Sequence, residues 1–497
     1  MLTLFTFLQR IKCSMKLLFP IKKSELKLFV PISLLMLLIL FNTSIFKTLK
    51  DTLMIADKNS GAEVVNFLKI FIVVPLSFLF VFLYSKACNW VDNRVIFYYV
   101  IGFFTLFFLI FTLYLYPNKE LLHPSPDHIE YLKLLYPRLK WVMPIYGLWT
   151  YSLFYSFADL WCSMCLSLLF WQFANQIVSK EDSRRFYGSF AIIGYLGLIF
   201  AGYTVKTIFH LERSSVKLNR NIIHDSLFDS QLKWILFITV ICNICIIGLY
   251  FLITKYVAHD NVKYTVKKSK LSLMSSFKVI FKQKQVMYIM LLVFCYNFSI
   301  NIVETTWKAQ LRKFAYNKSN FILYIGTINQ IVGYTTIALG FLSNILFQRY
   351  SWLSCAMITP IFAGFTSLLF LTFIGIQYYG IKYIFGISII AICVFVGIAH
   401  NVLSKSGKYV FFDQTKEMAY MSLSDEIKTK GKAAVDVAGS RLSKSLSGQV
   451  QALLLILIPN SSQLKIFPYL GIILCFIFLL WFWSLRKLSQ TMINVNK

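Results

Sequence analysis

Residues 29–49 read FVPISLLMLLILFNTSIFKTL, a run whose only charged residue, Lys47, stands near its end. A helix that crosses about 30 Å of hydrocarbon needs about 20 mostly apolar residues, because only a helix of that length satisfies its own backbone there. The run therefore predicts a membrane-spanning helix. Further runs of this kind follow, and with loose ends we predict twelve spans: 29–49, 65–85, 95–116, 146–174, 186–205, 234–254, 287–306, 321–344, 352–374, 380–402, 434–459 and 466–485.

The composition of the whole chain agrees with these spans. Of its 497 residues, 58% are hydrophobic and 14% are charged, and the mean hydropathy is +0.66. Such values exclude a cytosolic enzyme and a disordered scaffold. The formal net charge of +29 would indicate nucleic-acid binding in a soluble protein. In a membrane protein it indicates basic loops, so we expect the lipid bilayer as a partner and no nucleic acid.

Basic residues precede the first span, and no A-x-A cleavage site accompanies them. Lys and Arg are also more frequent in the loops on the N-terminal side of the predicted spans than in the loops on the other side. Because loops rich in Lys and Arg stay in the cytoplasm, we expect both termini there. The basic residues of the N-terminal segment are Arg10, Lys12, Lys16, Lys22, Lys23 and Lys27.

A long basic connection divides the spans into two sets of six. It carries eight lysines against the single acid Asp260. A cytoplasmic linker at this point is typical of a two-bundle transporter that holds its substrate near the midplane, although a solvated loop touching anionic lipid would look the same. The predicted regions are a basic N-terminus (1–28), an N-terminal bundle (29–254), the linker (255–286), a C-terminal bundle (287–485) and a C-terminal tail (486–497).

Several charged residues lie within or beside the predicted spans. A charge at the centre of a spanning helix costs about 2.5–3.5 kcal/mol on insertion scales, so it persists where it lines a cavity or finds a partner. Lysines near helix ends can reach the headgroups, whereas a short acidic side chain cannot. The acids therefore either pair with Arg441 or Lys444 or face a water-filled path. The charged positions are Lys47, Lys50, Asp51, Lys69, Asp159, Glu304, Arg441 and Lys444.

Together, two acids and several bases from both halves indicate a central polar site that favours an anionic ligand. No HExxH, GxGxxG or complete P-loop occurs. Residues 404–408 (SKSGK) resemble the end of a P-loop, but Tyr409 stands where a P-loop has the Ser or Thr that binds magnesium. Two CxxC pairs lie in apolar runs that suit neither zinc nor redox chemistry. We therefore expect no catalytic residues, no metal and no cofactor.

Several segments resemble the ATP/ADP translocase family of plastids and of rickettsial and chlamydial obligate intracellular bacteria. The resemblance runs in order along nearly the whole chain and is strongest from residue 401 to residue 436. The matching segments are 67–69 (FLK), 158–161 (ADLW), 169–177 (LFWQFANQI), 185–187 (RFY), 301–308 (NIVETTWK), 358–360 (ITP), 401–413 (NVLSKSGKYVFFD), 416–420 (KEMAY) and 430–436 (KGKAAVD).

The resemblance implies an all-α polytopic membrane protein with about twelve transmembrane helices in a major-facilitator-like, two-bundle arrangement. It also implies an antiporter rather than an enzyme, which imports host ATP and exports ADP, and possible co-export of phosphate, across the bacterial inner membrane without a required oligomer. Four positions that matter for transport in this family fall on residues already noted for their charge. The expected substrate-binding residues are Lys69, Asp159, Glu304 and Lys444, assisted by Lys50 and Arg441.

Some positions depart from the family pattern. The family commonly carries Glu where this chain has Asp159, and glycines surround the position of Lys444 where this chain reads SKSLS at 443–447. Fewer glycines restrict close approach of the backbone to a phosphate. These departures leave exchange of GTP/GDP, UTP or CTP open as an alternative. A major-facilitator-type transporter of an unrelated anionic solute is a second alternative.

Overall fold

A computed structural model describes most of the chain. The described residues are 21–178, 180–215, 223–257, 283–421, 423, 427, 435, 439–458 and 461–495. Most of the predicted linker and of the predicted N-terminal segment lie outside them.

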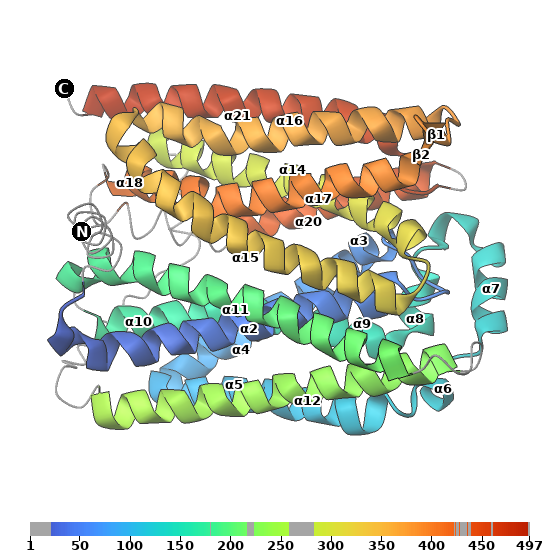
Figure 1. Ribbon diagram of the computed structural model, residues 1–497, viewed down its shortest axis with the longest axis horizontal. Coiled ribbons are helices and arrows are strands. Elements are labelled where there is room, and N and C mark those ends of the chain that lie inside the picture. The colour runs from blue at the N-terminus through green and yellow to red at the C-terminus, as the bar shows by residue number, and fades with distance from the viewer. Residues whose placement is uncertain are drawn as a thin grey trace, which may run out of the picture. The chain divides into compact units, whose positions relative to one another are not determined.

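The described chain is almost entirely helical (Figure 1). Several long helices contain short π-helical turns, in which the backbone bonds skip one residue more than in an α-helix. The elements up to the linker are η1 (Lys23–Glu25), α2 (Leu26–Ile55), α3 (Val64–Leu68), η2 (Lys69–Val73), α4 (Val74–Trp90), α5 (Asn93–Ile110), η3 (Phe111–Leu115), α6 (Lys119–Leu122), α7 (Pro126–Leu135), η4 (Pro137–Leu139), α8 (Met143–Gly147), α9 (Trp149–Met164), η5 (Cys165–Phe170), α10 (Trp171–Ile177), α11 (Lys180–Ser215), α12 (Ile223–Leu252) and η6 (Ile253–Val257).

Beyond the linker, long helices again dominate, and one short hairpin interrupts them. These elements are α14 (Lys284–Ala315), α15 (Lys318–Arg349), α16 (Trp352–Tyr378), β1 (Tyr383–Ile384), β2 (Ile387–Ser388), α17 (Ile389–Gly407), η7 (Lys408–Phe412), α18 (Asp413–Met421), α20 (Ser440–Leu457) and α21 (Phe467–Val495). The hairpin corrects the predicted start of the span at 380–402. Its turn places Phe385 and Gly386 at positive φ, and Gly380 before the hairpin also has a positive φ. An α-helix does not allow this conformation, so the helix begins at Ile389.

Ten helical stretches among the described residues are long and apolar enough to cross a membrane, and each coincides with a predicted span. The fourth and eleventh predicted spans are also helical but fall short of that criterion. The fourth is divided into α9, η5 and α10, and the eleventh is α20, whose apolar part covers only Leu442–Leu457. Both regions carry the polar residues that make them candidates for a substrate path, which is why their hydropathy is low.

The chain divides into two compact units, each discontinuous in sequence. The first unit contains residues 1–49, 82–117 and 157–267, and the second contains residues 50–81, 118–156 and 268–497. The division into two six-helix bundles remains a prediction. The second unit brings the segment from Lys50 to Val81 together with the helices beyond the linker.

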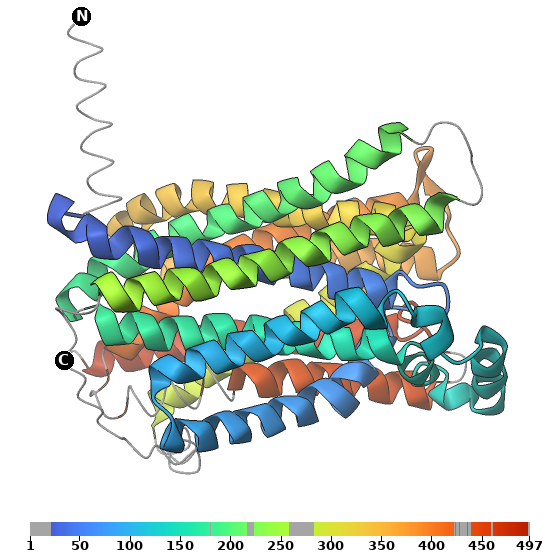
Figure 2. The same cartoon turned by 90° about the horizontal axis from the view of Figure 1, so that it is seen from below.

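Aromatic stacking and one close helix approach hold the first unit together. The ring of Phe46 stacks on Phe108 at 4.2 Å and meets Trp161 edge-on at 5.0 Å. On α11, Gly197 lies so close to α2 that an added Cβ would collide with the backbone carbonyl of Leu37. Gly194, whose added Cβ would lie 2.7 Å from Leu40, and Gly197 therefore serve helix packing here, as small residues do in many membrane bundles. Figure 2 shows α12 alongside α5, with which it packs.

In the second unit, α14 is the central helix. It packs against α17, α20 and α21, and α16 packs against α17 and α21 (Figure 1). Most of one side of α14 is buried, including several polar side chains between Asn297 and Gln310. Buried polar groups require partners, so the polar residues around α14 are candidates for a binding site.

Candidate substrate-binding site

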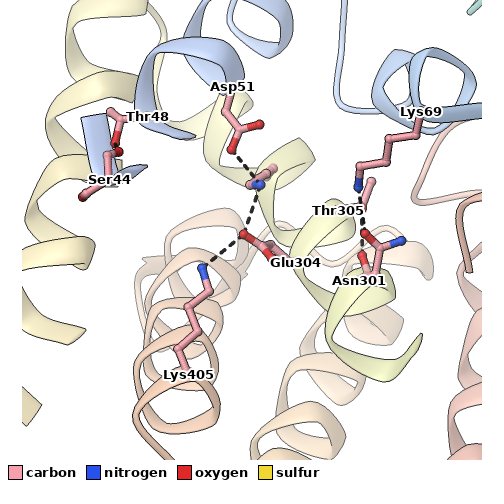
Figure 3. Close-up of polar contacts among 9 residues, drawn as sticks. Ser44, Thr48, Asp51, Lys69, Asn301, Glu304, Thr305 and Lys405 are labelled. Carbon is pink, nitrogen blue, oxygen red and sulfur yellow. Dashed lines mark hydrogen bonds and ion pairs between the residues drawn. The ribbon is translucent and has the colours of Figure 1, made fainter. Parts of the chain in front are cut away.

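Four charged side chains form a connected cluster in the second unit. Glu304 on α14 accepts from Lys308 at 3.0 Å and from Lys405 on α17 at 3.1 Å. Lys308 also binds the carboxylate of Asp51, near the end of α2, at 2.8 Å. Figure 3 shows Glu304 reaching Lys405 on one side and the lysine shared with Asp51 on the other. Two positive and two negative charges make this ion cluster neutral.

The ion cluster follows from helix geometry and from burial. Glu304 and Lys308 are four residues apart, so they lie on the same face of α14, with the acid toward the N-terminus in the favourable order. The side chain of Asp51 is only 7% exposed, and that of Lys308 is 14% exposed. Charges so far from water are retained only if they are paired, because either one alone would leave an uncompensated charge. The cluster therefore ties the end of α2 to α14 and α17.

Lys69 lies next to this ion cluster on a different element (Figure 3). Its ammonium donates a 2.9 Å hydrogen bond to the side-chain oxygen of Asn301 on α14. The amide of Asn301 in turn donates to the hydroxyl of Ser447 on α20 at 3.1 Å. Lys69 is also the first residue of the π-helical turn η2. Such turns often mark functional positions, since they rotate the side chains that follow.

The polar face of α20 carries Lys444. The hydroxyl of Ser440 accepts from Asn297, and Ser447 contacts Asn301, so both serines face α14. Lys444 is four residues after Ser440 and three before Ser447, which places it on the same side of α20. Its side chain is exposed within the described chain. Lys69 thus contacts Asn301 of α14 directly, and Lys444 lies on α20, which packs on α14.

The remaining predicted residues lie at different places. The Lys50 ammonium is buried and stands 4.2 Å from the centre of the Tyr155 ring, a cation–π contact. Asp159 is half-buried on α9 and belongs to the first unit. Arg441 lies on α20, and its side chain is outside the described part of the structure. Lys50, Lys69, Glu304 and Lys444 all belong to the second unit.

Sequence reasoning missed four members of this site. Lys308, Lys405 and Asn301 were not selected, and Asp51 was noted only as a charge after the first span. The spacing of Glu304 and Lys308 within an apolar helix was a signal, because two charges one helical turn apart form a pair at little cost. Lys405 belongs to the tract 404–408 that ends α17. Its neighbour Lys408 pairs with Asp413 at 2.7 Å, so this tract contributes ion pairs within the helical unit rather than a phosphate loop.

No group of three or more His, Cys, Asp or Glu side chains among the described residues is arranged to hold a metal ion. What the site offers instead is a set of ammonium groups, amides and hydroxyls. Such groups hold anions by charge and by hydrogen bonding, without covalent chemistry.

The fold has a counterpart among solved structures. A bacterial homologue of the iron transporter ferroportin, solved in an inward-facing state, superposes with a TM-score of 0.59 at 14% sequence identity, over 93% of this chain and 99% of that one. The shared fold and the long apolar helices define an all-α polytopic membrane protein.

The sequence comparison narrows this class to one family. The profile of the TLC ATP/ADP transporter family matches residues 8–492, and the chain belongs to that family. It is 36% identical to ADP,ATP carrier protein 3 of Rickettsia conorii, over 99% of both chains. It is 36% identical to ADP,ATP carrier protein 3 of Rickettsia prowazekii, over 98% of both chains. It is 35% identical to ADP,ATP carrier protein 1 of Rickettsia bellii, over 96% of this chain and 95% of the relative.

Proposed function

We propose that the chain is an antiporter that imports ATP and exports ADP across a bacterial inner membrane by alternating access, with both termini in the cytoplasm. Family membership and the names of the rickettsial relatives support the nucleotide pair. The excess of Lys and Arg in the loops on the N-terminal side supports the orientation.

The contact from Lys69 through Asn301 to Ser447 carries the assignment of the substrate site. This contact lines up an ammonium, an amide and a hydroxyl from three separate elements. In the proposed mechanism Lys69 and Lys444 hold phosphate oxygens of the nucleotide, with Lys50 and Arg441 adding positive charge. The amide of Asn301 donates a further hydrogen bond to the phosphates, and Ser447, whose hydroxyl donates to the carbonyl of Phe298 at 3.1 Å, holds that amide in place.

The neutral ion cluster couples binding to movement in this proposal. Lys308 and Lys405 share the carboxylate of Glu304, and a nucleotide phosphate is a competing partner for the same ammonium groups. An empty carrier keeps the pairs intact, because separating them would leave buried charges uncompensated. A bound nucleotide replaces those partners and lets the helices rearrange. Exchange then follows, because a ligand is required in both directions. Asp159 stays among the proposed substrate-binding residues.

The charge balance of the exchange supports phosphate as a third transported solute. ATP carries one more negative charge than ADP, and moving one charge against the membrane potential costs about 2.3 kcal/mol per 100 mV. Export of one phosphate monoanion, H2PO4−, together with ADP balances the charges. We therefore include phosphate among the proposed substrates.

Transport by reconstituted protein tests the proposal. Proteoliposomes loaded with ADP are expected to take up labelled ATP, whereas vesicles without internal nucleotide take up almost none. Equal uptake in both would contradict obligatory exchange. Excess unlabelled ADP, GTP, UTP and CTP, each added outside, identifies the preferred nucleotide. Lys69→Ala and Lys444→Ala are expected to abolish uptake, and Lys382→Gln, an exposed lysine of the β1 segment, serves as the control.

A further inference from the structure

A basic cavity lies in the second unit, apart from the residues around Glu304. It has a volume of about 250 Å³. Its lining comes from the loop after α2, from α7 and the segment that follows it, and from the C-terminal part of α14. Figure 2 shows the short helices that follow residue 118, in teal, beyond the ends of the long helices. The cavity is lined by Lys58, Asn59, Ser60, Lys133, Lys140, Trp141 and Arg312.

Hydrogen bonds to backbone carbonyls shape the loop that forms one wall. Arg312 donates to the carbonyls of Asp57 and Lys58, at 2.8 and 3.2 Å. From the other side Lys133 donates to the carbonyl of Asn59 at 3.2 Å. These donors come from α14 and α7 and fix three consecutive carbonyls. The wall is therefore held in place before any ligand arrives, which lowers the entropy lost on binding.

The charge around the cavity is strongly positive. Four of its seven lining residues are basic and none is acidic. Burial lowers the pKa of Lys140, Glu63 nearby opposes this, and the positive charge of Lys465 lowers it further. Glu130 already binds Lys133 at 2.7 Å, and Glu63 accepts from the backbone N–H of Gln463 at 3.0 Å. The pair with Glu130 compensates the charge of Lys133, and three further basic residues of the lining attract anions to the cavity.

A buried hydroxyl also faces this region without a partner. The side-chain oxygen of Ser60 is buried, and it makes no hydrogen bond to any described residue. A buried polar group without a partner is unfavourable, so it is usually satisfied by a ligand or water. The hydroxyl can donate to an anionic oxygen in the cavity.

Close packing by Gly61 completes the wall. An added Cβ at Gly61 would lie 2.7 Å from the Glu63 carboxylate, 3.1 Å from the Trp141 ring and 3.2 Å from the Arg312 guanidinium. Glycine therefore allows the indole and the guanidinium to meet the loop. The indole N–H of Trp141 donates to the carbonyl of Ser461 at 3.1 Å, so the ring is fixed and presents a rigid surface.

We propose that this cavity is a second anion site, which binds phosphate groups through Lys58, Lys140, Arg312 and Ser60. Its volume lies below the roughly 300–1,000 Å³ of sites that enclose whole drug-sized ligands. It accommodates one or two phosphate groups, with any attached nucleoside outside. The occupant is either free phosphate or the phosphate end of a nucleotide. The site does not depend on the proposed exchange, because none of its residues belongs to the substrate site around Lys69.

Chemical protection of individual lysines tests the site directly. The purified full-length protein is treated with an amine-acetylating reagent, with and without pyrophosphate, phosphate or ADP, and modification at each lysine is quantified by mass spectrometry. Pyrophosphate is expected to reduce modification of Lys58 and Lys140 at least about fivefold, because charge-assisted hydrogen bonds occupy the ammonium groups. Lys382, exposed and outside the cavity, is expected to react equally in all samples.

Matched variants separate binding in the cavity from other effects. Ser60→Ala combined with Arg312→Gln is expected to raise the pyrophosphate concentration that protects Lys140 about tenfold, because two hydrogen-bond donors are lost. Lys382→Gln is expected to leave it unchanged. Protection of Lys140 that persists fully in the double variant would overturn the proposal. So would equal reactivity of Lys140 with and without pyrophosphate, or equal protection by citrate at matched ionic strength.

Comparison of the three anions distinguishes free phosphate from a nucleotide as the ligand. The Lys69→Ala variant separates the cavity site from the proposed nucleotide exchange. If ADP and pyrophosphate protect at concentrations at least about tenfold below phosphate, the nucleotide is the ligand. If all three protect equally, free phosphate is the ligand. If the Lys69→Ala protein transports nothing but Lys140 is still protected, the cavity site is supported independently of transport. If a protein exchanges nucleotides but pyrophosphate does not protect Lys140, the cavity site is wrong and the proposed function stands.

Discussion

Lys405 and Glu304, one on α17 and the other on α14, meet at 3.1 Å although 101 residues separate them in the chain. Their side chains are only 26% and 25% exposed. The same carboxylate binds Lys308, so Glu304 is shared between two ammonium groups. A local pair within one helix is thereby extended into a tie between two helices.

We expect Lys405→Met to destabilise the protein by about 1–3 kcal/mol, because Glu304 loses one of its two charged partners in a poorly hydrated place. Glu304→Gln combined with Lys405→Met is expected to be more stable than the sum of the two single effects predicts, by at least about 0.5 kcal/mol. Thermal unfolding in detergent measures both. Additive effects would show that the two side chains do not interact. Lys408→Met removes the more exposed pair with Asp413 and serves as a milder control.

Asn301 allows a sharper test of the proposed phosphate contact. Asn301→Asp places a negative charge 2.9 Å from the Lys69 ammonium, where an amide oxygen now accepts its hydrogen bond. The new carboxylate competes with phosphate, so we expect ATP uptake to fall at least about tenfold although Lys69 is held more tightly. Asn301→Gln keeps a neutral amide and is expected to retain more activity. Full transport by Asn301→Asp would argue against Lys69 as a phosphate ligand.

Asp159 is expected to act through its charge rather than its length. Asp159→Glu keeps the carboxylate and adds one methylene, so we expect uptake within about threefold of the unchanged protein. Asp159→Asn removes the charge at nearly the same volume and is expected to reduce uptake at least about tenfold, since one charge-assisted hydrogen bond contributes about 1.5–3 kcal/mol. Uptake measured in ADP-loaded proteoliposomes compares the two. Equal activity of both variants would remove Asp159 from the site.

Gly197 provides a test of packing in the first unit. Gly197→Ala is expected to destabilise the protein by about 1–3 kcal/mol, because its Cβ meets the Leu37 backbone and α2 cannot yield as a flexible side chain would. Gly102→Ala on α5 is the matched control, since nothing lies within 4 Å of its added Cβ. We expect that control to be neutral or slightly stabilising. The reverse order of the two unfolding midpoints would contradict the close approach of α11 to α2.

His123, in the segment after α6, is expected to make stability depend on pH. Burial lowers its pKa below 6.5, Asp57 opposes this, and Lys119 and Lys318 lower it further. Its ring nitrogen Nε2 lies 2.7 Å from the hydroxyl of Thr150. Because the unfolded chain takes up the proton more readily, the contribution of neutral His123 is complete above pH 6.5 and is lost as the pH falls below that value.

We therefore expect the unfolding midpoint to decrease from pH 7.5 to pH 5.5 less steeply in His123→Gln than in the unchanged protein. His128→Gln changes an exposed histidine of α7 and is the control. An identical pH slope in the His123→Gln protein would show that this ring does not contribute. The comparison of slopes cancels the contributions of the other titrating groups.

The helical membrane fold could be predicted from the sequence because hydropathy is a local property. A run such as 29–49 leaves no alternative to a spanning helix, and ten predicted spans coincide with helices that are long and apolar enough. The same reasoning placed Lys69 and Glu304 among the charges that need an explanation, since any charge inside an apolar run is unfavourable wherever its partner lies. The family followed from the order of short motifs along the chain.

The partners that those charges find on other helices came only from the packing of segments that are distant in sequence. Glu304 was expected to pair with Arg441 or Lys444 or to face water, and its partners are Lys308 and Lys405. Asp51 and Lys308 are 257 positions apart, and no periodicity connects them. The cavity at Arg312 likewise depends on a loop, a short helix and a helix end meeting in space. Hydrophobic burial acts on each segment separately, whereas ion pairing and cavities require a specific register between segments, and only the folded chain defines that register.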